Sequence, residues 1–266
     1  MRLALAQLAI EGGAVANNRE RATEAIAAAA DRDADLVALP EIFNVGYFAF
    51  DSYRRAAEPL DGPTLTAIAD AAREHEVGVL AGSIVEDLAE TASAETPADE
   101  GLANTSVLFD REGRRLAHYR KHHLFGYESA ESELLVPGET LGVADFEDAT
   151  VGMTTCYDLR FPELYRSIAE TGANLILVPS AWPYPRVEHW KLLPEARAVE
   201  NQLFVATING TGAFEDAELL GRSTVYDPWG ATLASTGDDP DLVVTDIDLD
   251  RVAAVREEFP AWRDRR

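Results

Sequence analysis

The sequence contains a single cysteine, and this shortage excludes two kinds of site. One cysteine, Cys156, cannot form an internal disulfide or a thiolate metal cluster. The five histidines are scattered, apart from the adjacent pair His122 and His123, and none has the spacing typical of a metal site. We therefore expect no bound metal.

Long apolar runs are absent as well. No run approaches the ~18 residues that a membrane-spanning helix needs. Residues 1–7 alternate in polarity and are too short for a signal peptide. Because apolar residues still make up 47% of the chain, a substantial core is expected. We expect a cytoplasmic protein that does not bind membranes.

Positive charge is scarce. There are 47 acidic and 23 basic residues, which gives a formal net charge of -24, and Lys121 and Lys191 are the only two lysines. The acidic residues are dispersed, which argues against nucleic acid or an anionic membrane as a partner. Excess acid with almost no lysine is typical of proteins from extreme halophiles, and we interpret this chain as halophilic; an acidic mesophilic protein is the alternative.

The remaining pattern alternates strand-like runs with helical periodicity, and no linker interrupts it. It predicts a single α/β domain over residues 1–266, with two sheets and helices outside. We interpret the acidic stretch 86–101 as a solvated hairpin insertion, and we expect Asn17 or Asn18 to cap the first helix. The expected strands are 2–8, 36–39, 77–84, 105–109, 115–119, 150–155, 174–178, 203–208, 222–226, 232–234 and 242–246, and the expected helices are 17–30, 64–75, 162–170 and 189–200.

Two reactive side chains follow apolar strands. Glu41 comes after the run 36–39 and a proline, at a strand end where open α/β sheets place their ligands, although a lone glutamate there can equally be solvated. Cys156 ends the run 150–155 directly before a helix. The amides of a helix N-terminus favour a thiolate, although a lone cysteine can equally be a small core residue.

The scarcity of lysine makes the two that are present informative. If the surface excludes lysine, those that are kept are expected where a compact ammonium is required and the planar guanidinium of arginine is unsuitable. Lys121 follows a strand, but the argument applies equally to Lys191, so composition does not choose between them. A thiol, a carboxylate base and an ammonium are together the parts of an acyl-transfer site.

Three blocks together resemble the catalytic blocks of the nitrilase (carbon–nitrogen hydrolase) superfamily, in order and at familiar separations. They are residues 39–41, 119–125 and 156–166, and residues 189–190, 197–202, 221–224 and 227–230 match as well. The resemblance covers essentially the whole chain. It is stronger to the branch of omega-amidases and deaminated-glutathione amidases than to true nitrilases.

The resemblance implies a four-layer αββα sandwich with two mixed sheets, in which Glu41, Lys121 and Cys156 converge at one end. It also implies a second, supporting glutamate after the lysine block. Glu131 matches this position by its spacing of six residues to Pro137, and Glu128 is a rival in the same loop.

The activity implied is hydrolysis of a small amide to a carboxylate and ammonia through a cysteine thioester. Glu41 would be the base, while Lys121 and the backbone N–H of Tyr157 would hold the oxyanion. This chemistry needs no cofactor. Hydrolysis of an N-carbamoyl amine or amino acid, or of a nitrile, is an alternative at the same site. A catalytically inactive binding protein and a papain-like cysteine–histidine protease are alternatives of other classes.

Several further residues are candidates for the pocket or its frame. Tyr157 is a candidate for substrate binding, and so are the aromatic residues in loops after two strands, Tyr47, Phe48, Trp182 and Tyr184, which could equally be packing residues. We expect His123 to be a structural hydrogen-bonding residue. We expect Arg160 to pair with a nearby carboxylate, or alternatively with a carboxylate of the substrate.

The resemblance also implies a homodimer or a larger homo-oligomer. The contact would involve the helix after Cys156 and the helix over residues 189–200.

The acidic surface leads to a prediction about salt. At 0.1 M salt the Debye length is ~10 Å, and near 1 M it falls to ~3 Å, which screens repulsion between surface carboxylates. We expect the melting temperature and the activity to rise steeply between about 0.1 M and about 1 M KCl, because the repulsion acts over the whole surface. A melting temperature that is flat over this range would contradict the halophilic interpretation.

Overall fold

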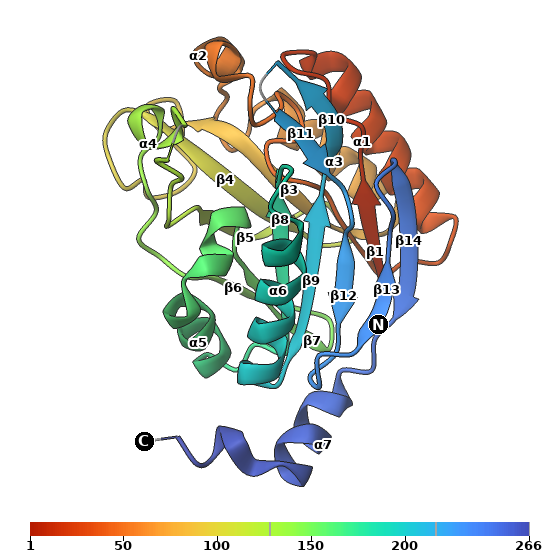
Figure 1. Cartoon of the computed structure of the whole chain (residues 1–266). Coiled ribbons are helices and arrows are strands. Elements are labelled where there is room, and N and C mark those ends of the chain that lie inside the picture. Colours follow the sequence, from red (N-terminus) through yellow and green to blue (C-terminus); the bar gives the residue numbers. More distant parts are fainter. Residues whose placement is uncertain (128, 216, 266) are drawn as a thin grey trace.

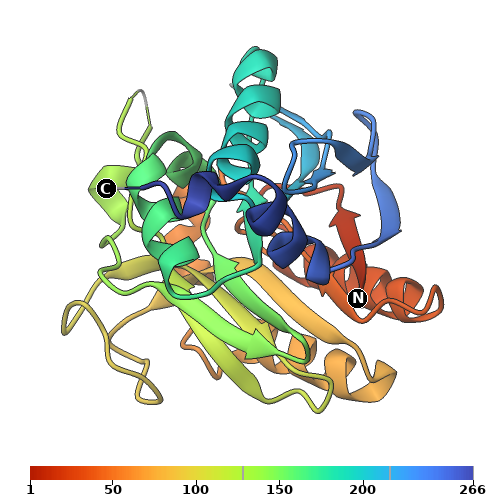
Figure 2. The ribbon, with the colours of Figure 1, turned by 90° about the horizontal axis from the view of Figure 1, so that it is seen from below.

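The computed structural model describes residues 1–127, 129–215 and 217–265, and these form four layers (Figure 1). Two six-stranded mixed sheets pack face to face. Helices α1 and α3 cover the first sheet, and helices α5 and α6 cover the second (Figures 1 and 2). The predicted αββα sandwich with two mixed sheets is confirmed.

The first sheet has the strand order β14–β1–β2–β3–β4–β5. Its central strands β1, β2 and β3 are parallel, and β14, β4 and β5 are joined antiparallel at the sides. The bounds are β1 Arg2–Gln7, β2 Leu36–Ala38, β3 Gly78–Asp87, β4 Leu102–Phe109, β5 Arg115–Arg120 and β14 Asp241–Asp246.

The second sheet has the order β13–β12–β9–β8–β7–β6, with β7, β8 and β9 parallel. A separate hairpin, β10–β11, stands outside both sheets. The bounds are β6 Gly142–Phe146, β7 Ala149–Met153, β8 Leu175–Ser180, β9 Phe204–Asn209, β10 Thr211–Phe214, β11 Ala217–Leu220, β12 Thr224–Tyr226 and β13 Thr232–Ser235.

Four of the five described helices of nine or more residues, α1, α3, α5 and α6, agree with the four predicted from periodicity, and the fifth is α7. The bounds are α1 Val15–Ala30, α2 Tyr53–Ala56, α3 Pro63–His75, α4 Glu131–Leu134, α5 Pro162–Glu170, α6 Val187–Asn201 and α7 Asp250–Glu258, with 3-10 turns at Phe50–Ser52, Cys156–Arg160 and Pro260–Trp262. No helix in the described part of the chain has both the length and the apolar character that crossing a membrane requires.

Strand β1 shows how side-chain alternation divides the core. Leu3 and Leu5 lie in the cluster between the two sheets, whereas Ala4 and Ala6 lie in the cluster under α1 and α3. All four are fully buried. Because successive side chains of a strand point to opposite faces, a strand buried on both faces must be apolar throughout. The sandwich therefore requires the continuous apolar runs on which its strands were predicted.

Two local predictions are wrong. The expected insertion 86–101 begins too early, because Glu86 and Asp87 belong to β3 and the side chain of Glu86 is fully buried against Arg120. The first helix has Ala14 at its N-cap without a side-chain cap. Asn18 lies inside that helix, where its side chain accepts from the Glu11 N–H and donates to the Glu11 carbonyl.

Strand β6, the hairpin β10–β11 and helix α7 were not predicted. Strand β6 pairs with β7 across the two residues Glu147 and Asp148, and Glu147 has a φ of 51°. This turn lacks the glycine that normally reveals a two-residue hairpin in a sequence. Figure 2 also shows the C-terminal segment after α7 running back to α5, where Arg265 forms an ion pair with Glu170 at 2.8 Å.

Candidate active site

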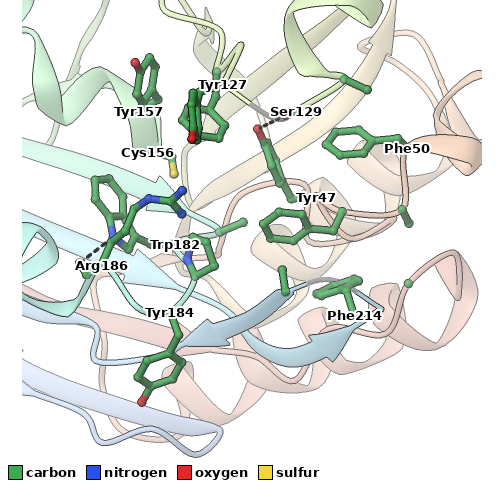
Figure 3. A pocket seen from close by; sticks show the side chains of 18 of the residues that line it. Tyr47, Phe50, Tyr127, Ser129, Cys156, Tyr157, Trp182, Tyr184, Arg186 and Phe214 are labelled. Atoms are coloured by element: carbon green, nitrogen blue, oxygen red, sulfur yellow. Dashed lines mark hydrogen bonds between the residues drawn. The ribbon is translucent and has the colours of Figure 1, made fainter.

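The carboxyl ends of strands from both sheets meet at one cavity of about 930 Å³. Glu41 follows β2, Lys121 follows β5 and Cys156 follows β7. Lys121 and Cys156 line the cavity, and Figure 3 shows the Cys156 sulfur facing it. The structure thus brings together the three residues that the sequence predicted would converge.

Lys121 lies between two buried carboxylates. Its Nζ atom is 2.8 Å from Oε1 of Glu41, and 2.8 and 2.9 Å from the two carboxylate oxygens of Glu131. The side chains of both glutamates are fully buried and Lys121 is 1% exposed. Charges removed from water to this extent are stable only when they are paired and hydrogen-bonded, so the three side chains form one unit.

Glu131 has the contacts expected of a supporting residue. Its carboxylate also accepts from the Tyr47 hydroxyl at 3.0 Å and from the Phe125 N–H at 2.7 Å. The side-chain amide of Asn104 donates to both carboxylates, at 2.8 Å to Glu41 and 3.2 Å to Glu131. The rival candidate, Glu128, lies outside the described residues.

The position of Glu41 depends on a close approach of backbone. Its second oxygen, Oε2, accepts from the Ala181 N–H at 2.9 Å, at the end of β8 in the other sheet. A Cβ on Gly82 would lie 2.0 Å from the carbonyl oxygen of Leu39, so only glycine fits beside the turn that carries Glu41. The carboxylate is therefore fixed from both sheets.

Cys156 begins a short 3-10 turn with a positive φ of 46°. A non-glycine residue in this conformation is strained, and such strain persists only where neighbouring contacts impose it. Here a capping box joins Thr155 and Asp158, in which the Asp158 carboxylate accepts from the Thr155 N–H at 2.9 Å. The same carboxylate accepts from the Tyr119 hydroxyl at 2.7 Å and from the His123 N–H at 3.0 Å.

Burial and the neighbouring buried charges shift the pKa values of Glu41 and Lys121. Burial raises the pKa of Glu41; the positive charge of Lys121 opposes this, and the negative charge of Glu131 adds to it. Burial lowers the pKa of Lys121, but the charges of Glu131 and Glu41 outweigh it and hold that pKa well above its ordinary range. The ammonium is therefore charged at neutral pH.

The helix amides that the sequence predicted would favour a thiolate do not lower the pKa of Cys156 in the free site. Burial and the charge of Glu41 raise the pKa of Cys156 well above its ordinary range, and the opposing charge of Lys121 does not compensate. The turn that starts at Cys156 has only five residues, and α5 begins at Pro162. The resting sulfur is therefore a neutral thiol that needs a base.

Comparison with known proteins agrees with this geometry. The family model described as carbon-nitrogen hydrolase matches residues 2–257. The chain belongs to the carbon–nitrogen hydrolase family. It is 38% identical to a 2-oxoglutaramate amidase of Paenarthrobacter nicotinovorans over 237 residues, which are 88% of this chain and 79% of that protein. It is 36% identical to the human omega-amidase over 276 residues, 100% of this chain and 95% of that protein.

Solved structures of related proteins share the fold. The nitrilase-superfamily member Nit3 of Saccharomyces cerevisiae superposes with a TM-score of 0.89 at 30% identity, covering 100% of this chain and 96% of the other. An amidase of Nesterenkonia sp. AN1 superposes with a TM-score of 0.82 at 30% identity, covering 98% of each chain. In a mutant of that amidase, acrylamide has added to the active-site cysteine.

The pocket of this hydrolase contains the aromatic residues that the sequence proposed. Tyr47, Tyr157 and Trp182 all line the cavity, as do Phe48 and Tyr184. Figure 3 shows Tyr157 and Trp182 near Cys156, with Tyr47 across the cavity. Tyr47 also holds Glu131 in place through the hydrogen bond from its hydroxyl. The same residue can therefore both line the cavity and have a structural role.

Two predictions about neighbouring residues have different outcomes. His123 has the structural role expected, because its Nδ1 is 2.7 Å from Asp158 and its ring stacks on Phe161 at 3.6 Å. Arg160 does not pair with a nearby carboxylate among the described residues. It lines the cavity instead, over the rings of Trp182 at 5.0 Å and Tyr157 at 5.7 Å.

The structure also decides between the two lysines. Lys191 is 53% exposed and pairs with Glu188 at 3.3 Å one turn away on α6. Lys121 is the lysine in the cavity. The scarcity of lysine therefore pointed to a site residue in one of the two cases, Lys121, and to an exposed residue in the other. The described lining residues include no histidine, which leaves Cys156 without the partner that a papain-like protease requires.

Sequence reasoning missed three residues that hold the frame of the hydrolase site. Asn104 lies in β4 and bridges the glutamates, and Asp158 sits in the cysteine block without an assigned role. Asn209, at the end of β9, accepts from the Trp182 N–H at 2.8 Å and donates to its carbonyl at 3.1 Å. A buried polar residue at a strand end was the available signal for Asn104 and Asn209. Within the described residues, no group of three or more potential ligands could hold a metal ion.

The raised pKa of Cys156 leads to a prediction about alkylation. The rate of modification by iodoacetamide should have its pH midpoint above the ordinary cysteine value of about 8.5, because the thiolate is the nucleophile. Glu41→Gln removes a negative charge that raises this pKa, so the midpoint should move to lower pH. Mass spectrometry should find one adduct in the wild type and none in Cys156→Ser. Identical midpoints in the wild type and Glu41→Gln would contradict the coupling.

Proposed function

We propose that this protein is an amidase that uses Cys156 as nucleophile, Glu41 as general base and Lys121 as oxyanion partner. The observation that carries the proposal is the convergence of a neutral thiol, a buried carboxylate and a buried ammonium at one cavity. Family membership and the amidases among the relatives support the same reaction.

The first half-reaction forms a thioester. Glu41 accepts the thiol proton of Cys156, and the sulfur attacks the amide carbon while the carbonyl electrons move to oxygen. The N–H of Tyr157 donates to no group among the described residues, so it is available to the oxyanion. When the tetrahedral intermediate collapses, the C–N bond breaks. The nitrogen takes the proton from Glu41 and leaves as ammonia.

The positive charge of Lys121 stabilises a negative charge both before and after the proton leaves the thiol. Before proton transfer the ammonium pairs with the negative charge of Glu41, and after it Glu41 is neutral and the negative charge lies on the substrate oxygen. A donor of Lys121 is then free to turn to the oxyanion, while Glu131 holds the ammonium in place. Because the number of buried charges does not change, the transition state needs little reorganisation.

The second half-reaction hydrolyses the thioester. Glu41 takes a proton from water, the hydroxide attacks the thioester carbon, and the C–S bond breaks. The sulfur recovers its proton from Glu41, and the product leaves as a carboxylic acid that loses its proton to the solvent. No step needs a group that the chain does not supply.

We further propose that the substrate is a monoamide of a short dicarboxylic acid. The first support is Arg160, four residues after Cys156, whose guanidinium lines the cavity without a described carboxylate within 4.0 Å. The second is that relatives over nearly the whole chain are a 2-oxoglutaramate amidase and an omega-amidase. Nothing in the described site favours a carbamoyl compound or a nitrile over an amide.

Ammonia release tests the function. In about 1 M KCl, where screening favours the folded state, the wild type should release ammonia from dicarboxylate monoamides faster than from N-carbamoyl amino acids or aliphatic nitriles. Cys156→Ala should retain less than about 1% of the activity with its fold intact, because the nucleophile is lost but little volume leaves the core. Substantial activity in that variant would exclude Cys156 as the nucleophile.

The two lysines provide a matched pair of substitutions. Lys121→Arg should be nearly as damaging as Lys121→Ala, because a guanidinium changes shape and reach at the oxyanion; loss of such a donor typically lowers kcat by about 10²–10³-fold. Lys191→Arg should have little effect, since that side chain is exposed. Equal and mild effects on kcat at the two positions would remove Lys121 from the mechanism.

We also propose a homo-oligomer with α5 and α6 at the contact. On α6 the side chains of Leu192 and Val199 are 62% and 46% exposed, and they lie seven residues apart on one face. Burial of this face would brace the Cys156 turn through Arg197, which donates to the Leu159 carbonyl at 2.8 Å. Light scattering in about 1 M KCl should show a dimer or larger species, and an active monomer would refute it.

The other expectations from composition are kept as proposals. We propose that residues 1–266 form one hydrolase domain and that the enzyme acts in the cytoplasm of a cell with high internal salt. Limited proteolysis that released a stable fragment carrying its own core would contradict the first.

A further inference from the structure

Arg186 occupies the loop between β8 and α6 and lines the same cavity as Cys156. Its carbonyl accepts from the indole N–H of Trp182 at 3.1 Å, which fixes its backbone. Figure 3 shows Arg186, Trp182 and Cys156 together at one end of the cavity, with Phe50 and Phe214 at the other.

Local stability does not explain an arginine at this position. Arg186 is the N-cap of α6 and makes no side-chain cap. Ser, Thr, Asp and Asn are preferred there, and a cation beside a helix N-terminus is electrostatically unfavourable. In the described part of this strongly acidic chain, no carboxylate lies within 4.0 Å of its guanidinium. A residue that breaks a local rule without a visible structural gain points to function.

Aromatic rings hold Arg186 in relation to Arg160. The Arg186 guanidinium lies 5.6 Å from the centroid of the Phe125 ring, Phe125 meets the ring of Tyr157 edge to face at 4.9 Å, and Tyr157 lies 5.7 Å from the Arg160 guanidinium. Stacking on a ring orients a guanidinium while its N–H edge stays available for hydrogen bonds. Two oriented cations therefore belong to the Cys156 end of the cavity.

The charge of the whole protein makes local cations necessary for an anionic substrate. A net charge of -24 repels a carboxylate at the surface, so binding needs a positive patch inside the cavity. The acidic residues of the lining, Asp51 and Glu215, follow Phe50 and Phe214 and thus belong to the aromatic end. Among the described lining residues, Arg160 and Arg186 lie toward the thiol, and the two carboxylates follow Phe50 and Phe214.

We propose that Arg186 is a specificity-determining residue that binds the far carboxylate of the substrate together with Arg160. Charge-assisted hydrogen bonds from two guanidiniums would select a monoamide with a terminal carboxylate over a neutral amide of the same length. The inference rests on the proposed amidase function and assigns its selectivity to a loop outside the three catalytic blocks.

Steady-state kinetics with two amides tests this. Succinamate carries the far carboxylate, and butyramide is its neutral counterpart. Arg186→Gln should raise KM for succinamate about 10- to 100-fold with kcat changed less than about threefold, as expected for loss of a hydrogen bond to a charged group made equally in the ground and transition states. Its kcat/KM for butyramide should be unchanged. Arg186→Lys should recover part of the loss, because it keeps the charge without the planar fork.

Arg54→Gln is the matched control, since Arg54 is exposed, lies outside the cavity lining and changes the net charge equally. It should leave both substrates unaffected. Equal losses for succinamate and butyramide in Arg186→Gln, or no loss for either, would overturn the role of Arg186 and leave the amidase proposal standing. A wild type that releases ammonia from neither amide nor any other monoamide would overturn the amidase proposal and this inference with it.

Discussion

The buried ion cluster of Glu41, Lys121 and Glu131 is the constraint on which the rest of the site depends. Three charges removed from water would be strongly destabilising if any one of them lost its partners. Each carboxylate oxygen of the cluster therefore also has a donor besides Lys121: Asn104 in β4 donates to one oxygen of each glutamate, and the backbone N–H groups of Ala181 and Phe125 donate to the other two. The two sheets and the α4 loop must meet correctly for these charges to be satisfied.

A second polar network fixes the nucleophile. Asp158 gathers donors from Thr155, Tyr119 and His123, and so ties the strained turn at Cys156 to β5 of the opposite sheet. A positive φ at a cysteine costs roughly 1–3 kcal/mol. The network holds the sulfur at the cavity, while β5, which carries Tyr119, leads directly into Lys121. Strand β5 thereby couples the position of the nucleophile to that of the ammonium.

The charge distribution serves two opposing requirements. The chain has a formal net charge of -24, yet the cavity near the thiol contains Lys121, Arg160 and Arg186. The two kinds of positive charge differ in their environment. Lys121 is fully paired and buried inside the protein. The two arginines instead lie over aromatic rings with no described carboxylate within 4.0 Å, and Nη2 of Arg160 is 3.2 Å from Nδ1 of His189.

Most of the secondary structure, the fold and the main site residues could be predicted from the sequence alone. Apolar runs and helical periodicity predicted most strands and four of the five described helices of nine or more residues, because burial on two faces or on one stripe imposes a period that can be read locally. The resemblance of three blocks predicted the fold, and it placed Glu41, Lys121, Glu131 and Cys156 at one site. The scarcity of lysine pointed to two lysines, one of which lies in the cavity.

Only the tertiary structure decided the rest. It decided that the pKa of the Cys156 thiol is raised rather than lowered, and that Arg160 has no described carboxylate partner. It also showed the contacts that Asn104, Asp158 and Arg186 make. These properties depend on which groups from distant strands come within about 3 Å of each other and on how much water they exclude. No local pattern encodes those distances, because they arise where the ends of strands from two separate sheets meet.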